Sequence, residues 1–144
     1  MSVRYRHTQR GTLTLTVLIV AAAFCGFTAW YIPDSGRWPQ LVLAVMFAVM
    51  AVHFSSLTVV VDGDELQWYF GPGPWTYKLP RGDIASVEIV RNKVSNGFGI
   101  RRRPGFRLYN VSGLDAVELR LKSGDIRRIG TDDAPGLAAA LRSA

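Results

Sequence analysis

The side chains with the clearest capacity for chemistry are basic, and they gather between positions 91 and 107. Three consecutive arginines, residues 101–103, form the densest run of charge in the chain. Guanidinium and ammonium groups can hold the phosphates of anionic lipids, and each is worth about 1 kcal/mol close to such a surface. The candidate lipid- or partner-binding residues are Arg91, Lys93, Phe98, Arg101, Arg102, Arg103 and Arg107.

A second interpretation of the same residues needs no ligand. Runs of like charge are commonly solvated loops between strands, and such a loop would also reinforce one membrane topology. Phe98 then either dips into the bilayer interface or fills the end of a barrel. Nucleic acid is not expected as a partner, because residues 57–144 carry thirteen basic and ten acidic side chains and show no recognition helix or aromatic RNA-binding signature.

Nothing in the chain predicts catalysis, a metal site or a cofactor. Asp132 and Asp133 are adjacent, but helix capping explains both carboxylates. Gly97 and Gly99 lack the strand–loop–helix context that a phosphate-binding loop needs. The single Cys25 and the two histidines do not form a set of metal ligands with neighbouring carboxylates. We therefore expect a protein that is not an enzyme.

The elements that must position the basic residues begin with two apolar segments. Residues 11–33 contain no charged side chain, and residues 38–61 contain none apart from the titratable His53. About 20 such residues cross the hydrocarbon core of a bilayer. The turn-rich PDSGRWPQ between them allows only a tight hairpin. The sequence thus predicts two transmembrane helices over residues 11–56. A cleaved signal peptide is the alternative for the first segment, but the apolar run is long for one and a second span follows at once.

Flanking charge predicts how this hairpin is oriented. Arg4, Arg6 and Arg10 precede the first span, whereas Asp34 and Arg37 cancel in the loop. The positive-inside rule then keeps residues 1–10, a basic tail, in the cytoplasm. Two spans return the chain to the same side, so both termini are expected to be cytoplasmic, in a bacterium at the inner membrane.

From residue 57 the pattern changes to short strands separated by turns, followed by one helix. Residues 117–121 alternate apolar and polar side chains, as a half-buried strand does. Thr131-Asp132-Asp133 supplies an N-cap, and residues 135–141 have helical spacing. The other expected strands are residues 57–61, 66–70, 75–79, 84–90, 106–109 and 126–129.

This order resembles the pleckstrin-homology-like (PH-like) fold, in particular the small bacterial PH-like domains tethered behind two transmembrane helices. The resemblance rests on residues 98–102 (FGIRR), 108–113 (LYNVSG) and above all 128–133 (RIGTDD) leading into the final helix. It implies a partly open barrel of about seven strands with a C-terminal capping helix, forming a cytoplasmic domain over residues 57–144. It also implies a binding or scaffolding module. The first hairpin is acidic (Asp62, Asp64, Glu65), which argues against an anionic headgroup site there.

Two functions follow as expectations. One is a non-catalytic, membrane-anchored scaffold or accessory subunit that acts through protein contacts, as a homo-oligomer or with another membrane protein. The alternative is a sensor of anionic lipid headgroups that uses the loop 101–103. Small residues in the spans would let helices approach closely, although they also suit packing of the hairpin against itself. They are Ala21, Ala22, Ala23, Gly26, Ala44, Ala48 and Ala51.

Overall fold

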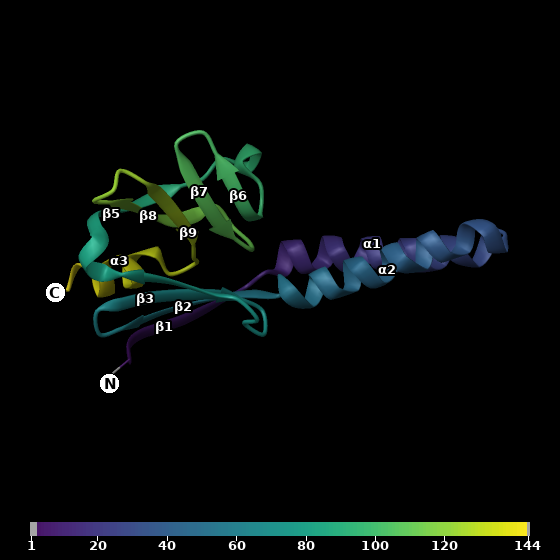
Figure 1. The fold of residues 1–144 in the computed structure, drawn as a ribbon, viewed down its shortest axis with the longest axis horizontal. Coiled ribbons are helices and arrows are strands. Elements are labelled where there is room, and N and C mark those ends of the chain that lie inside the picture. Colours follow the sequence, from purple (N-terminus) through teal and green to yellow (C-terminus); the bar gives the residue numbers. More distant parts are fainter. Residues whose placement is uncertain (1–2, 144) are drawn as a thin grey trace.

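The computed structural model describes residues 3–143 of the chain and shows an elongated molecule (Figure 1). A pair of long helices projects from one end of a β-rich domain. The Val3 end of the first strand and the end of the last helix lie at the opposite end of that domain.

The projecting pair consists of α1 (Thr12–Tyr31) and α2 (Asp34–His53), each 20 residues long. At 1.5 Å per residue each measures about 30 Å, the thickness of a hydrocarbon core. Both are apolar enough to cross a membrane by length and composition, which confirms the prediction of two such helices. Pro33 ends the short connection, with the extended backbone that proline favours just before a helix.

The first sheet is a four-stranded antiparallel meander in the order β1-β2-β3-β4. Its strands are β1 (Val3–Arg10), β2 (Ser56–Asp62), β3 (Glu65–Phe70) and β4 (Thr76–Pro80). The expected basic tail is therefore wrong as a description of Val3–Arg10. This segment pairs along β2 from Val3 opposite Asp62 to Arg10 opposite Ser56, because the hairpin returns the chain beside its own start.

The second sheet has the order β5-β8-β9-β7-β6, with β7 and β9 parallel and the other neighbours antiparallel. Its strands are β5 (Ile84–Arg91), β6 (Gly99–Arg103), β7 (Phe106–Asn110), β8 (Asp115–Leu121) and β9 (Ile126–Gly130). The arginine run is thus an edge strand, not the loop expected from sequence. Pro104 and Gly105 make the turn that folds it back on β7.

Between the sheets lies an apolar core that the last helix, α3 (Ala134–Arg142), helps to close. Trp68 is fully buried there, with its ring 5.6 Å from Tyr77 and 5.2 Å from Tyr109. Complete burial of one large apolar side chain contributes about 1.5–3 kcal/mol. The Asp133 side chain accepts a hydrogen bond from the Gly136 amide, the cap predicted from sequence.

The predicted arrangement of a helical hairpin followed by a mainly β domain and a C-terminal helix is confirmed. The described residues form nine strands instead of about seven, because β1 and β6 join the sheets, and the two sheets do not close into a barrel.

Candidate functional site

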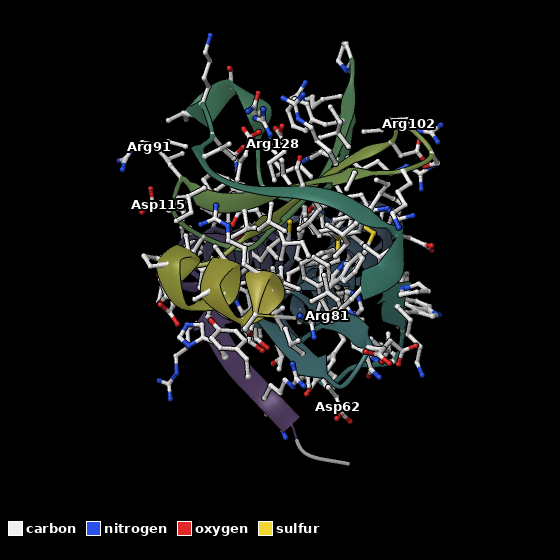
Figure 2. All side chains as sticks on the ribbon, turned by 90° about the vertical axis from the view of Figure 1, so that its left-hand side faces the viewer. Asp62, Arg81, Arg91, Arg102, Asp115 and Arg128 are labelled. Carbon is white, nitrogen blue, oxygen red and sulfur yellow. The ribbon has the colours of Figure 1, made fainter. Side chains whose placement is uncertain are left out.

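The seven basic and aromatic residues predicted as a site do not gather on one surface. Arg91 and Arg102 point to opposite sides of the domain, with Arg128 between them (Figure 2). Arg91 lies 3.1 Å from the carboxylate of Asp115 and is largely exposed. Its charge is already paired, so it is a poor partner for an external anion. Lys93, two residues on, is exposed.

Arg101 and Arg103 donate hydrogen bonds to main-chain carbonyls of the segment just before β6. Arg103 donates from Nε to the carbonyl of Asn96 at 3.1 Å and from Nη2 to the carbonyl of Ser95. Arg101 donates from Nε to the carbonyl of Phe98 at 2.9 Å. These bonds fix the segment between β5 and β6 over the outer face of the second sheet. For Arg103, a role within the fold explains the residue without a ligand.

Arg102 and Arg107, unlike Arg101 and Arg103, each lie opposite another arginine. They face each other directly across β6 and β7, and both are exposed. Arg127 on β9 lies directly beside Arg107 in the parallel pairing. These three residues, together with Arg103 and Asp125, line a cavity of about 370 Å³ at this end of the sheet.

Phe98 lines a different, mainly apolar groove of about 580 Å³ at the base of the helices, which we call the basal groove. Its walls are the first two turns of α1, the end of α2 and residues 97–101. Phe98 is half-buried and Ile100 is 44% exposed. Arg101 is the charged residue of this lining. Of the seven predicted residues, only Phe98 and Arg101 share this site.

The junction between the helical hairpin and the β domain is held by hydrogen bonds. The acceptors include residues of the segment 108–113, one of the motifs on which the PH-like resemblance rests. Gln9 is buried and donates to the carbonyl of Ser112 at 2.8 Å, and the Thr14 hydroxyl donates to the carbonyl of Val111 at 2.5 Å. The Gly11 amide donates to the carbonyl of Ser55 at 2.8 Å. The segment 108–113 therefore holds the start of α1 against the second sheet.

The acidic pair before α3 holds the other end of β1. Tyr5 donates to Asp133 at 2.9 Å, and His7 lies 2.5 Å from Asp132. Burial, followed by the hydrogen bond to Asp133 and the negative charge of that carboxylate, raises the pKa of Tyr5 well above its ordinary value. Asp132 and Asp133 thus both bind the first strand, and Asp133 alone of the two caps α3.

Sequence reasoning missed Arg127, Ile100 and the groove-lining residues of α1. Ile100 stands in an arginine-rich run without apolar alternation, and Arg127 is brought beside Arg107 only by the parallel pairing of β7 and β9. One signal was available in the sequence. Arg102 and Arg107 lie at equal distances on either side of the turn at Pro104 and Gly105, and this spacing predicts that they pair across a hairpin.

Comparison with known proteins does not add a family to this description. No protein-family model matches the chain, and no curated protein is similar to it.

Proposed function

We propose that the chain is a non-catalytic, membrane-anchored module of PH-like fold that scaffolds a complex at the cytoplasmic face of a bacterial inner membrane. The observation that carries the proposal is the surface of the hairpin. Between Thr12 and His53 the buried residues are Cys25, Ala29 and Ala51, while large apolar side chains such as Trp30 are up to 82% exposed. Such a surface needs lipid or other helices around it.

The predicted orientation agrees with this proposal. Arg4, Arg6 and Arg10 lie in β1, which contacts the C-terminal helix, and this contact supports an orientation with both termini on one side. By the positive-inside rule that side is the cytoplasm.

A groove of small residues supports contact with a second membrane helix. It has a volume of about 510 Å³ and runs beside the α1–α2 contact, with Ala22, Ala23, Ala48 and Ala51 in its lining. Gly26 continues this stripe one turn beyond Ala22, and a Cβ atom built there meets no atom within 4 Å. Small residues let two helix backbones approach closely. We propose this face as the lateral contact, with a second copy or another membrane protein.

The test is the mass of the complex extracted from its native membrane in a mild detergent, for the natural chain and for Gly26→Leu. Because nothing in the chain surrounds Gly26, the substitution should leave the fold intact and release the second polypeptide or the second copy. Val20→Leu is the matched control, since Val20 is 61% exposed and lies away from the groove lining. A natural chain that is extracted as a monomer without partners would contradict the proposal.

The basal groove favours lipid contact as a second candidate function. It lies where the two helices meet the domain, and it combines an apolar lining with the guanidinium of Arg101. An acyl chain and an anionic headgroup would suit that combination. Phosphatidylglycerol should remain on the purified chain in preference to phosphatidylcholine, and Arg101→Gln should weaken it by about fivefold, the equivalent of about 1 kcal/mol. Equal retention of both lipids would exclude this function. Arg91→Gln is the control, because Arg91 is paired with Asp115.

A further inference from the structure

Three arginines stand in one row across the second sheet. Arg102 on β6 is directly opposite Arg107 on β7, and Arg107 is directly beside Arg127 on β9. Residues paired in this way point to the same face of a sheet, and neighbouring strands are about 4.8 Å apart. We call Arg102, Arg107 and Arg127 the arginine ladder. It lies on the side that faces the core, because the Arg127 guanidinium is 5.9 Å from the centre of the Trp68 ring.

The ladder carries charge that the fold does not neutralise. Four other arginines in the described part of the chain are within 4 Å of an acidic side chain, among them Arg91 with Asp115 and Arg128 with Glu118. Among the residues that the structure describes, no carboxylate lies that close to a ladder arginine. Asp125 lines the same cavity as the ladder but forms no ion pair with it. Like charges directly opposite each other destabilise a sheet. Repulsion within the row therefore lowers the stability of the sheet locally, and a bound anion would reduce that repulsion.

The backbone of β6 also lacks a strand partner on one side, because β6 is the last strand of its sheet among the described residues. An extended peptide can add to such an edge through main-chain hydrogen bonds, with alternate side chains setting specificity. Ile100, 44% exposed, and Arg102 are two residues apart on β6 and point to the same face. A strand added here would place one side chain opposite Ile100 and another opposite Arg102.

The positive charge of the β6 edge determines which kind of strand can pair with it. A second copy of β6 would set arginines against arginines, so self-association through this strand is disfavoured. We propose that the β6 edge and the arginine ladder bind an extended acidic segment of a different protein, one that alternates apolar and acidic residues. The apolar side chain lies against Ile100, and the carboxylates lie over Arg102, Arg107 and the neighbouring cavity of about 370 Å³. This inference rests on the proposed function, since it names the surface through which the scaffold would hold a partner.

The probe is a synthetic eight-residue peptide of alternating valine and glutamate, titrated onto the full chain in nanodiscs of phosphatidylcholine. We expect saturable binding to the natural chain, weakened at least fivefold in Arg107→Gln, because loss of one charge-assisted contact costs about 1 kcal/mol or more. Arg107→Gln should also raise the melting temperature of the peptide-free chain by a few degrees, since it removes the central repulsion of the row. Arg91→Gln should change neither quantity.

The outcomes separate this inference from the proposed function. Binding that is lost in Arg107→Gln together with a raised melting temperature supports the ladder as a partner site. No binding, binding unchanged in Arg107→Gln, or a peptide of alternating valine and lysine that binds equally well would overturn it. Displacement of the peptide by inorganic pyrophosphate at equal charge concentration would also overturn it, in favour of a small anion. Each of these failures leaves the complex mass and the Gly26→Leu result unaffected, so the proposed function is judged on its own experiment.

Discussion

The hairpin and the β domain use the same apolar residue types in opposite ways. Trp30 in α1 is 82% exposed, whereas Trp68 in β3 is fully buried. The domain turns its apolar side chains inward, as a body surrounded by water does, and the hairpin turns them outward. The difference supports the proposed placement of the hairpin in lipid and of the domain in water, because the same residue type is exposed in one region and buried in the other.

The two regions are nevertheless joined without a flexible linker. β1 continues through Gly11 into α1, and only two residues separate the end of α2 from the start of β2. Because β1 and β2 pair along their length, the hairpin and the first sheet form one continuous ribbon of chain (Figure 1). The paired strands β1 and β2 therefore connect both helices directly to the first sheet.

The largest expected difference between the two regions comes from removing one tryptophan from each. Trp68→Ala should lower the free energy of unfolding of the domain by about 3–5 kcal/mol, because it leaves a cavity in the core. Trp30→Ala should change it by less than about 0.5 kcal/mol, since that ring touches little of the chain. Urea unfolding of the full chain in detergent micelles, followed by circular dichroism, measures both. Equal effects would contradict the assignment of two environments.

A smaller effect is expected at the joint. A Cβ atom on Gly11 would lie 2.5 Å from the carbonyl oxygen of Phe54, so Gly11→Ala must push β1 and the end of α2 apart. We expect a loss of about 1–3 kcal/mol, the usual cost of overpacking, and faster amide exchange in residues 8–15. Gly26→Ala is the control, because a Cβ atom there meets nothing within 4 Å. Unchanged exchange in Gly11→Ala would mean that the joint is looser than the structure indicates.

The smallest effect is confined to alkaline pH. Burial and Asp133 raise the pKa of Tyr5, and burial raises that of Tyr77, so the folded chain keeps these protons longer than the unfolded chain does. Stability is therefore fully present below the ordinary tyrosine pKa of about 10 and falls as the pH rises above it. Tyr5→Phe should flatten this fall while lowering the melting temperature at pH 7 slightly through the lost hydrogen bond. Melting temperatures between pH 8 and 11 give the slope, and an unchanged slope would exclude Tyr5 as its source.

Much of this architecture could be predicted from the sequence, because its signals are local. Charge-free runs of about 20 residues predict the helices, and alternation predicts β8, where Val117 and Leu119 face the core. The turn at Ser123 and Gly124 and the cap at Asp133 are local as well. Each of these signals lies within a few residues of the element it defines.

The strands that were missed have weak or misleading signals. β1 alternates Tyr5, His7 and Gln9 toward the core with arginines and Thr8 outward, but only one of the three inward residues is strongly apolar. Its partner strand lies about 50 residues away, beyond the hairpin. β6 is an edge strand, and edge strands tolerate charge that a central strand does not.

The candidate sites depended most on tertiary structure. The run 101–103 predicted a single basic patch, but strand alternation sends Arg101 and Arg102 to opposite faces. The ladder is completed by Arg127, which no local pattern connects to Arg102. The basal groove similarly combines the start of α1 with residues 97–101.

The central claim is that lipid, and not water, surrounds the hairpin while water surrounds the domain. Single cysteines placed at Val20 and Ser123, in a chain whose Cys25 is replaced by alanine, test it with a water-soluble maleimide. Both positions are exposed in the structure, so both would react readily in water. In open membrane fragments we expect Ser123→Cys to react rapidly and Val20→Cys to remain unlabelled until the chain is denatured. Labelling of Val20→Cys at the rate of Ser123→Cys in the same membrane fragments, before denaturation, would contradict the claim.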